Sequence, residues 1–311
     1  PGLADWLIRV PNTLRQRWWY ESGIGRMAAR ERADVLLMPA NHAARRGPVP
    51  QVVVIHDVNF LTAPGTYERA QTRYLTWSYR RAVRDADAVI TVSQFSKSEI
   101  SRHLGVDPAA IDVVYSGLRP PLDGVPAEAP LDQPYALWVG ATEVSKNVGL
   151  LVDAWSTRAP ADLRLVIVGP PGRDHATLVA RSAALGGRVS IRGAVDESEL
   201  ERWYRHAAVF LFPSRTEGFG FPPLEAMLRG VPVVAANAGS LPEVLGDAAL
   251  FHDPDDPAGL TTQVERLGQD DALRSRQIKR GLERAARFQW GRAGADTAAV
   301  LRAAATSPRR R

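Results

Sequence analysis

Several residue types are scarce in this chain of 311 residues, and each scarcity excludes something. The chain has no cysteine, which excludes disulfides and thiolate metal sites. No apolar run approaches the roughly 20 residues that a helix needs to cross a bilayer, and no leader pattern opens the sequence. We therefore expect a soluble, cytoplasmic protein.

Lysine is also scarce. It occurs three times, at Lys97, Lys146 and Lys279, against 36 arginines, and the formal net charge is +5. No nucleic-acid-binding motif accompanies this charge, so we expect no nucleic-acid partner. A basic surface is nevertheless compatible with peripheral contact at the inner face of a membrane or with a phosphorylated acceptor. The sequence gives no indication of oligomeric state.

What the chain does contain is an alternation of short apolar runs with helical patterns, which indicates doubly wound α/β domains. A first block has helical patterns near 67–84 and 94–104. Its predicted strands are 35–38, 52–55, 88–92 and 112–115. The predicted strands of a second block are 135–139, 165–168, 189–191, 209–212, 231–235 and 249–251.

The two blocks predict two Rossmann-like domains. A proline-rich stretch at 119–130 indicates a linker. We expect an N-terminal domain at 1–120, a linker at 121–134, a second domain at 135–285, and a C-terminal helix with a basic tail at 286–311. Because the chain starts at Pro1 and its first convincing strand lies at 35, we also expect the first domain to be shortened by about one strand-helix unit.

The most informative segment runs from Ser214 to Asp247. Glu217 and Glu225, with seven residues between them, flank a Gly-Phe-Gly-Phe-Pro-Pro turn that follows a buried strand. Glycine permits close backbone approach, and proline suits the first turn of the following helix. Free amides at a helix start can bind a diphosphate, while carboxylates accept hydrogen bonds from sugar hydroxyls. The alternative is a helix start that simply favours acidic residues.

This segment, continued by GVPVVAANAGSLPEVLGDAALFHDPDD at 230–256, resembles the signature of retaining family 4 glycosyltransferases, also called glycosyl transferases group 1. That resemblance implies the two-domain glycosyltransferase type B fold, with both domains facing a cleft. It also implies that Glu217 contacts the transferred sugar and Glu225 the nucleotide ribose. The amides of Gly218, Phe219, Gly220 and Phe221 would contact sugar and phosphates.

A second loop follows the strand at 135–139. A lysine beside a helix start suits a diphosphate, although a solvated loop lysine is the plainer interpretation. The resemblance favours Lys146 as a catalytic residue, with Gly140 and Asn147 also binding substrate. The family usually has an arginine-lysine pair here. In this chain Ala141, Thr142 and Ser145 occupy the positions available to that arginine.

In the first block, His56 and Asp57 follow the strand at 52–55. A lone histidine is more often structural, but the family has a histidine-aspartate pair at this strand end. The resemblance therefore implies that His56 donates to a sugar hydroxyl or positions the acceptor. Asp57 would orient His56 and help to bind substrate.

Three weaker features complete the site predictions. Asp85 and Asp87 resemble a metal-binding aspartate pair, but they precede a strand followed by the helix cap Ser93, so we predict no metal and no cofactor. Residues 193–195 match the position where the family packs the nucleotide base. Ser116 and Gly117 are expected in a loop near the donor.

The predicted activity is a retaining, metal-independent hexosyltransferase. It would move a hexose or deoxyhexose from a UDP-, GDP- or dTDP-sugar to a hydroxyl of a saccharide, lipid-linked saccharide or natural product, as in bacterial polysaccharide biosynthesis. Two alternatives stay open. One is a non-catalytic nucleotide-sugar-binding partner subunit, and the other is an epimerase or phosphorylase of the same fold.

Overall fold

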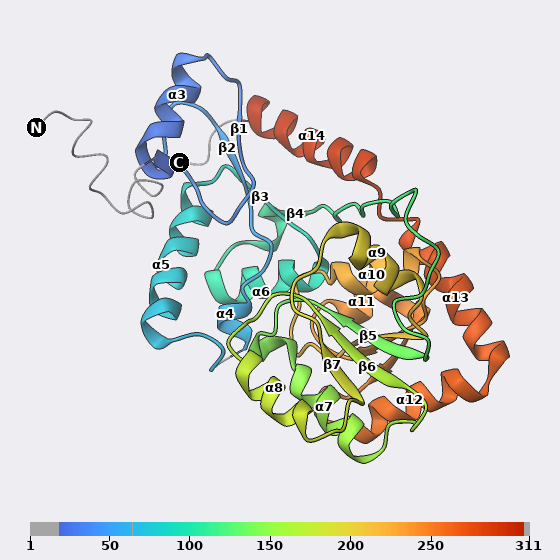
Figure 1. Cartoon of the computed structure of the whole chain (residues 1–311). Coiled ribbons are helices and arrows are strands. Elements are labelled where there is room, and N and C mark those ends of the chain that lie inside the picture. Colours follow the sequence, from blue (N-terminus) through green and yellow to red (C-terminus); the bar gives the residue numbers. More distant parts are fainter. Residues whose placement is uncertain (1–18, 64, 308–311) are drawn as a thin grey trace, which may run out of the picture. The chain divides into compact units, whose positions relative to one another are not determined.

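The structure is a computed structural model that describes residues 19–63 and 65–307. The chain divides into two compact units (Figure 1). Unit 1 comprises residues 1–115 and 291–311, and unit 2 comprises residues 116–290. The C-terminal segment therefore belongs to the same unit as the N-terminal half of the chain.

Unit 1 is built on a parallel sheet of order β1-β2-β3-β4. Its strands are β1 (Leu36–Met38), β2 (Gln51–Val54), β3 (Ala88–Thr91) and β4 (Ile111–Val113). Its helices are η1 (Trp19–Gly23), α3 (Ile24–Arg30), α4 (Asn59–Thr62), α5 (Arg69–Asp85), α6 (Gln94–Leu104), η2 (Pro108–Ala110) and α14 (Trp290–Thr306). The four predicted strands of the first block are thus present within about two residues.

The sheet of unit 1 is covered on both faces, because successive strand residues point to opposite sides. Val53 packs in a core that includes Tyr79 of α5 and Ile100 of α6. Val52 packs in a second core with Ala293 and Ala304 of α14. The C-terminal helix therefore supplies one of the two layers that bury this sheet.

Unit 2 contains the larger sheet, which is wholly parallel and has the order β7-β6-β5-β8-β9-β10. Its strands are β5 (Tyr135–Val139), β6 (Arg164–Val168), β7 (Val189–Ile191), β8 (Val209–Phe212), β9 (Val233–Ala236) and β10 (Ala249–His252). Its helices are η3 (Val144–Lys146), α7 (Val148–Thr157), α8 (His175–Ala183), α9 (Glu197–Arg205), α10 (Phe221–Leu228), α11 (Leu241–Leu245), η4 (Gly246–Ala248), α12 (Pro257–Gln269) and α13 (Asp271–Ala285). The predicted α/β class is confirmed.

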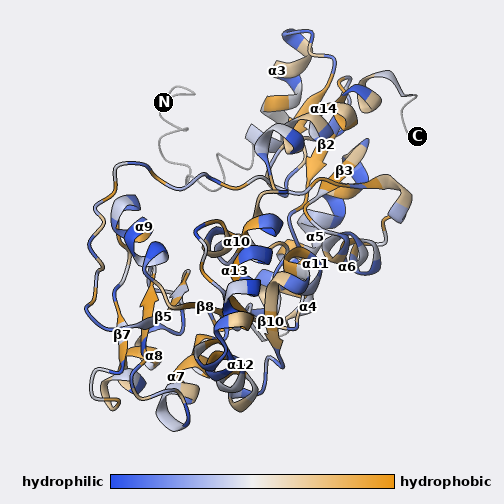
Figure 2. Ribbon diagram, turned by 90° about the vertical axis from the view of Figure 1, so that its right-hand side faces the viewer, coloured by the Kyte–Doolittle hydropathy of each residue, from blue (hydrophilic) through white to orange (hydrophobic). Residues whose placement is uncertain are grey.

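The strands of unit 2 are apolar because helices bury them from both sides. All four residues of β8 and of β9 are buried, and β5 and β7 are coloured as hydrophobic in Figure 2. Trp138 of β5 and Phe210 of β8 are fully buried. Each such side chain contributes about 1.5–3 kcal/mol to folding.

One predicted element needs correction. The helical pattern at 282–305 is two helices, because α13 ends at Ala285 and α14 begins at Trp290. Gly117 lies against this break, and a Cβ there would come within 2.3 Å of the backbone nitrogen of Trp290. Leu118 N–H also donates to the carbonyl of Phe288. Gly117 thus has a packing role where the chain enters and leaves unit 2.

Candidate active site

The sheet order of unit 2 creates a crevice at a defined place. From β5 the chain runs outward through β6 and β7, and from β8 it runs outward in the opposite direction through β9 and β10. The loops that follow two neighbouring strands therefore diverge where the strand order reverses. Ligands of open α/β sheets bind there, outside the carboxyl ends of the strands. The loops that follow β5 and β8 carry Lys146 and Glu217.

Lys146 and Glu217 form an ion pair. Lys146 Nζ donates to Glu217 Oε1 at 2.7 Å, and the side chains are 30% and 10% exposed. The pair brings together the residues assigned by resemblance to the diphosphate and to the sugar. A mostly buried carboxylate needs such a partner, and the partner also fixes both side chains at the switch point.

The glycine turn after Glu217 starts helix α10. Gly220 has φ +90°, a conformation that disfavours any residue with a Cβ. Pro222 and Pro223 then occupy the first helical turn, as predicted from the sequence. The N-terminus of α10 consequently lies directly after the carboxylate that pairs with Lys146.

The two phenylalanines of this turn differ in exposure. Phe219 is 4% exposed and its ring contacts those of Phe221 and Phe288 at centroid distances of 5.0 and 5.5 Å. Phe221 itself is 38% exposed. The buried ring anchors the turn, so any ligand contact of Phe219 would come from its backbone.

Asn147 holds three loops together. It adopts a left-handed conformation, with φ +54°. Its side-chain Nδ2 donates to the carbonyls of Pro213, at 3.1 Å, and Pro254, at 2.8 Å. Both amide hydrogens thus tie the loop after β5 to the loops after β8 and β10. This fixes Lys146 next to it, whereas direct substrate contact by Asn147 stays a prediction.

Glu225 lies one turn into α10 and is half-buried. Its Oε2 accepts a hydrogen bond of 3.0 Å from the hydroxyl of Tyr204 on α9. Tyr204 lies beneath the guanidinium of Arg229, 5.1 Å from ring centroid to Cζ, and Arg229 in turn pairs with the buried Glu201. The sequence reasoning missed these three residues. The sequence held a signal for Glu201 and Arg229, in the four-residue spacings between Glu201 and Arg205 and between Glu225 and Arg229, but none for Tyr204.

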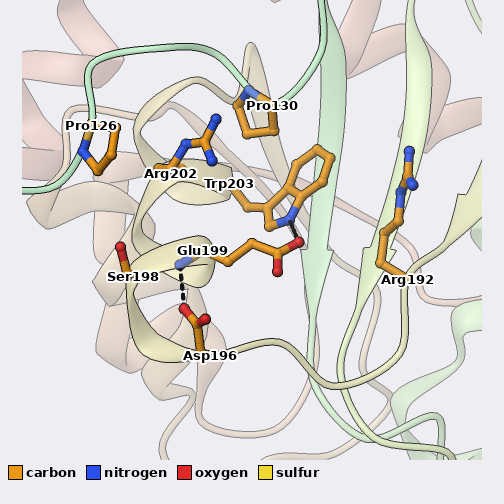
Figure 3. Close-up of a pocket in the computed structure, with 8 residues that line it drawn as sticks. All are labelled: Pro126, Pro130, Arg192, Asp196, Ser198, Glu199, Arg202 and Trp203. Atoms are coloured by element: carbon orange, nitrogen blue, oxygen red, sulfur yellow. Dashed lines mark hydrogen bonds between the residues drawn. The ribbon is translucent and has the colours of Figure 1, made fainter.

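The loop between β7 and α9 contains the predicted base-packing residues, 193–195. Beside it is a pocket of roughly 390 Å³ (Figure 3). Its lining residues are Pro126, Pro130, Arg192, Asp196, Ser198, Glu199, Arg202 and Trp203. Two of its carboxylates have structural partners, because Asp196 accepts from the Glu199 N–H and Glu199 from the Trp203 indole. The pocket therefore lies next to the predicted base segment, and neither Lys146 nor Glu217 lines it.

In unit 1, His56 is exposed at the carboxyl end of β2. Its Nε2 lies 3.1 Å from the Pro39 carbonyl, which can only accept. Nε2 therefore carries a hydrogen that it donates to this carbonyl, so a sugar hydroxyl would have to contact Nδ1, and the expected role of His56 stays a prediction. Asp57 does not orient the ring. Its Oδ1 accepts from the Asn59 N–H, and no hydrogen bond joins it to His56 among the described residues.

The aspartates before β3 have structural partners. Asp85 is held by Arg81 and Arg84, and Asp87 accepts from the Gln51 N–H. Ser93 caps α6, as predicted, by accepting from the Ser96 N–H. Within residues 19–63 and 65–307, no three histidine or acidic side chains gather in a way that could hold a metal ion. In the same residues no helix has both the length and the apolar character to cross a membrane.

Comparison with known proteins identifies the family. Glycosyltransferase Family 4 matches residues 2–120, and Glycosyl transferases group 1 matches residues 133–270. O-antigen chain mannosyltransferase B of Escherichia coli is 34% identical over 77% of this chain and 66% of its own length. A D-inositol 3-phosphate glycosyltransferase of Streptomyces bingchenggensis is 29% identical over 86% of this chain and 64% of its own length.

Solved structures show the same fold. Sucrose-phosphate synthase of Thermosynechococcus elongatus gives a TM-score of 0.75 at 22% identity, covering 90% of this chain and 76% of that one. The Anabaena protein HepE in complex with UDP-glucose gives 0.69 at 20% identity, covering 82% and 72%. Two Rossmann-like units of this kind define the glycosyltransferase type B fold. The chain belongs to the glycosyl transferases group 1 family, and it spans about two thirds of the length of these curated relatives.

Proposed function

We propose that this chain is a retaining, metal-independent glycosyltransferase that moves a hexose or deoxyhexose from a nucleoside-diphosphate sugar to a hydroxyl. The observation that carries the proposal is the Lys146–Glu217 ion pair at the switch point of unit 2, immediately before the N-terminus of α10. The ion pair and the start of α10 together place one positive charge, one carboxylate and a set of backbone amides close to one another. A sugar diphosphate requires these three kinds of group.

The positive and negative groups of the site would bind different parts of the donor. Lys146 and the first amides of α10 would meet the charge that develops on the leaving diphosphate, which is electrostatic preorganisation. Glu217 would accept hydrogen bonds from the transferred sugar. Lys146 and the amides would thus perform the charge neutralisation that a metal ion performs in other transferases.

Retention requires the acceptor oxygen to bond to the anomeric carbon on the face from which the diphosphate leaves. In the proposed step the carbon–oxygen bond to phosphate breaks as the new glycosidic bond forms. The leaving phosphate oxygen takes the acceptor proton. His56 would accept from or orient a sugar hydroxyl from unit 1. Measuring the anomeric configuration of the product tests this step directly.

For the donor, mannose is the first sugar to test, because the E. coli relative is named a mannosyltransferase. Uridine diphosphate is the first nucleotide to test beside guanosine diphosphate, because HepE was solved with UDP-glucose. The acceptor would be a saccharide or lipid-linked saccharide of a bacterial polysaccharide.

The proposed location is the cytoplasm, with peripheral contact at an anionic membrane through helix α5. Its exposed face carries Trp77 and Tyr74, which are 49% and 44% exposed. Aromatic rings beside guanidinium groups suit the lipid headgroup region. The helix has one acidic residue, Asp85, and its arginines are Arg69, Arg73, Arg80, Arg81 and Arg84.

Calorimetric titration tests the proposal. UDP, GDP, dTDP and their common sugars are titrated into the wild type and into Lys146→Ala. Lys279→Ala, at an exposed position on α13, serves as the control. We expect one nucleotide class to bind and Lys146→Ala alone to weaken it about tenfold or more. A wild type that binds none of these nucleotides would contradict the proposal.

The same purified protein separates the alternatives. A transferase consumes the donor in step with the acceptor. An epimerase would convert the donor sugar without an acceptor, and a phosphorylase would respond to inorganic phosphate. A non-catalytic partner subunit would bind the nucleotide sugar and turn over none of it.

A further inference from the structure

A cluster of charged and polar side chains, buried at its centre, joins helices α9 and α10. Its members, which we call the Glu201 cluster, are Glu201, Tyr204, Arg205, Glu225 and Arg229. Glu201 is 2% exposed and Tyr204 is 1% exposed. The charges at its centre have therefore been removed from water, which is costly unless each is paired and hydrogen-bonded.

The contacts of the cluster satisfy this requirement. Arg229 donates to Glu201 Oε2 from Nε at 2.9 Å and from Nη2 at 2.6 Å. Arg205 Nε donates to Glu201 Oε1 at 2.7 Å. Both oxygens of Glu201 are thus occupied. Burial pushes the pKa of Glu201 upward, but the hydrogen bonds from Arg229 and Arg205 outweigh it and hold that pKa below the usual value.

The cluster leads to Glu225 by two routes. Arg229 Nη1 donates to the backbone carbonyl of Glu225 at 2.9 Å, while its guanidinium lies over the ring of Tyr204. Tyr204 donates to Glu225 Oε2 at 3.0 Å. Burial and the nearby Glu225 carboxylate raise the pKa of Tyr204 well above its ordinary value, so its hydroxyl keeps the proton that it donates.

We propose that Tyr204 positions Glu225, fixing the carboxylate in the orientation that accepts hydrogen bonds from the ribose hydroxyls of the donor nucleotide. This inference rests on the proposed nucleotide-sugar transfer. Tyr204 occupies Oε2 from the buried side, and no hydrogen bond to Oε1 is found among the described residues. Oε1 and the second lone pair of Oε2 thus remain for two neighbouring hydroxyls. A fixed carboxylate binds such a diol better than one that must first be ordered.

The Glu201 cluster also ties ribose recognition to helix α9. That helix begins at Glu197, directly after the predicted base segment at 193–195 and beside the pocket of Figure 3. The same helix carries Tyr204 two turns further on. The base segment and the ribose carboxylate are thereby held at a constant separation by one helix and one hydrogen bond.

Tyr204→Phe tests the inference, because it removes one hydroxyl and keeps the ring beneath Arg229. Affinities for UDP and GDP are compared with those for their 2′-deoxy and 3′-deoxy counterparts. We expect the wild type to prefer the ribonucleotide. Tyr204→Phe should bind the ribonucleotide about five- to tenfold more weakly, with little change for the deoxy forms, so the ribose preference falls by the same factor.

Tyr135→Phe is the matched control. Tyr135 is also a buried tyrosine of unit 2, and its hydroxyl donates to the backbone carbonyl of Trp203 at 2.9 Å, not to Glu225. The control should keep the ribose preference even if it lowers stability. With a competent acceptor, Tyr204→Phe should raise the donor KM and leave kcat close to that of the wild type.

The outcomes separate the two proposals. If the wild type binds no nucleotide, the proposed function and the inference both fall. If it prefers ribonucleotides and Tyr204→Phe keeps that preference, the positioning role falls and the proposed function stands. An equal loss of preference in Tyr135→Phe would mean that the effect comes from general loosening of unit 2, and it would also overturn the inference.

Discussion

The carboxyl ends of the strands differ between the two units. In unit 2, Lys146 and Glu217 hold each other, and Glu225 is held by Tyr204. In unit 1, the ring of His56 is exposed, and its Nε2 is hydrogen-bonded to the backbone carbonyl of Pro39. One edge thus keeps its charges in fixed side-chain pairs, whereas the other presents an exposed ring held by a backbone carbonyl. Fixed charges suit the diphosphate of the donor, which is the same in every nucleoside-diphosphate sugar. An exposed ring suits the acceptor, whose structure differs from one transferase to another.

Among the variants proposed here, Glu217→Gln should cause the largest loss of turnover. The amide keeps the shape of the side chain but removes the charge that pairs with Lys146 and accepts from the sugar. We expect turnover to fall about 100-fold or more, while nucleotide affinity changes by less than about fivefold. Turnover is measured with the donor and acceptor that support wild-type activity.

Glu265→Gln, an exposed change on α12 of the same unit, controls for altered charge in that experiment. It should leave turnover unchanged. A Glu217→Gln protein with wild-type turnover would remove the sugar-binding role of Glu217 and leave the ion pair a purely structural feature.

His56→Ala should affect only acceptor chemistry. We expect turnover to fall about 10- to 100-fold, and calorimetry should give an unchanged affinity for the nucleotide. His103→Ala, on α6 of the same unit and paired with Glu99, is the control. If nucleotide affinity fell in parallel with turnover, the proposal that His56 acts on the acceptor and not on the nucleotide would be wrong.

Helices α5 and α13 extend the comparison to the surfaces of the two units. Each has five basic residues, but only α5 exposes two aromatic rings, Tyr74 and Trp77. Arg73→Glu with Arg80→Glu should lower binding to vesicles of phosphatidylcholine and phosphatidylglycerol about fivefold in a sedimentation assay. Arg276→Glu with Lys279→Glu on α13 makes the same change in charge and should have a smaller effect. Equal losses would mean that net charge alone governs binding.

Most of the fold was predictable from the sequence, because most of the strands are short runs of consecutive apolar residues that the structure buries. The sequence did not reveal the end of α13 at Ala285, since the helical pattern continues across the break between α13 and α14, where Gly117 packs against Trp290. Local composition does not record such a contact between distant segments. The break lies where the chain leaves unit 2.

The candidate site was predictable where motifs are contiguous. Glu217, Gly220 and Lys146 lie in two loops that the family resemblance marks, and the structure brings those loops together. Tyr204 and Arg229 were not predictable, because their roles depend on how α9 packs against α10. Asn147 shows a further limit. Its position in the loop was expected, but its two hydrogen bonds to the carbonyls of Pro213 and Pro254 come from segments far along the chain.

The smallest expected effect concerns the pH dependence of stability and comes from His252, which is buried where His56 is exposed. It is the last residue of β10, whereas His56 follows the end of β2, and it is only 5% exposed. Its Nδ1 lies 2.7 Å from the Asp253 carbonyl, so Nδ1–H donates there. Burial lowers the pKa of His252 below the ordinary value of 6.5, against smaller opposing effects that include this hydrogen bond. The native state therefore resists protonation, whereas the unfolded chain does not.

The sign of the pH dependence follows from that difference. As pH falls below about 6.5, the unfolded state takes up a proton before the folded state does, so the free energy of unfolding decreases. We expect His252→Asn, which retains a donor near Nδ1, to reduce this decrease in urea titrations at pH 7.5, 6.5 and 5.5. The decrease should not vanish, since burial also lowers the pKa of His42 in unit 1. If His252→Asn kept the wild-type slope, His252 would not be the group whose burial couples protonation to the folding of unit 2.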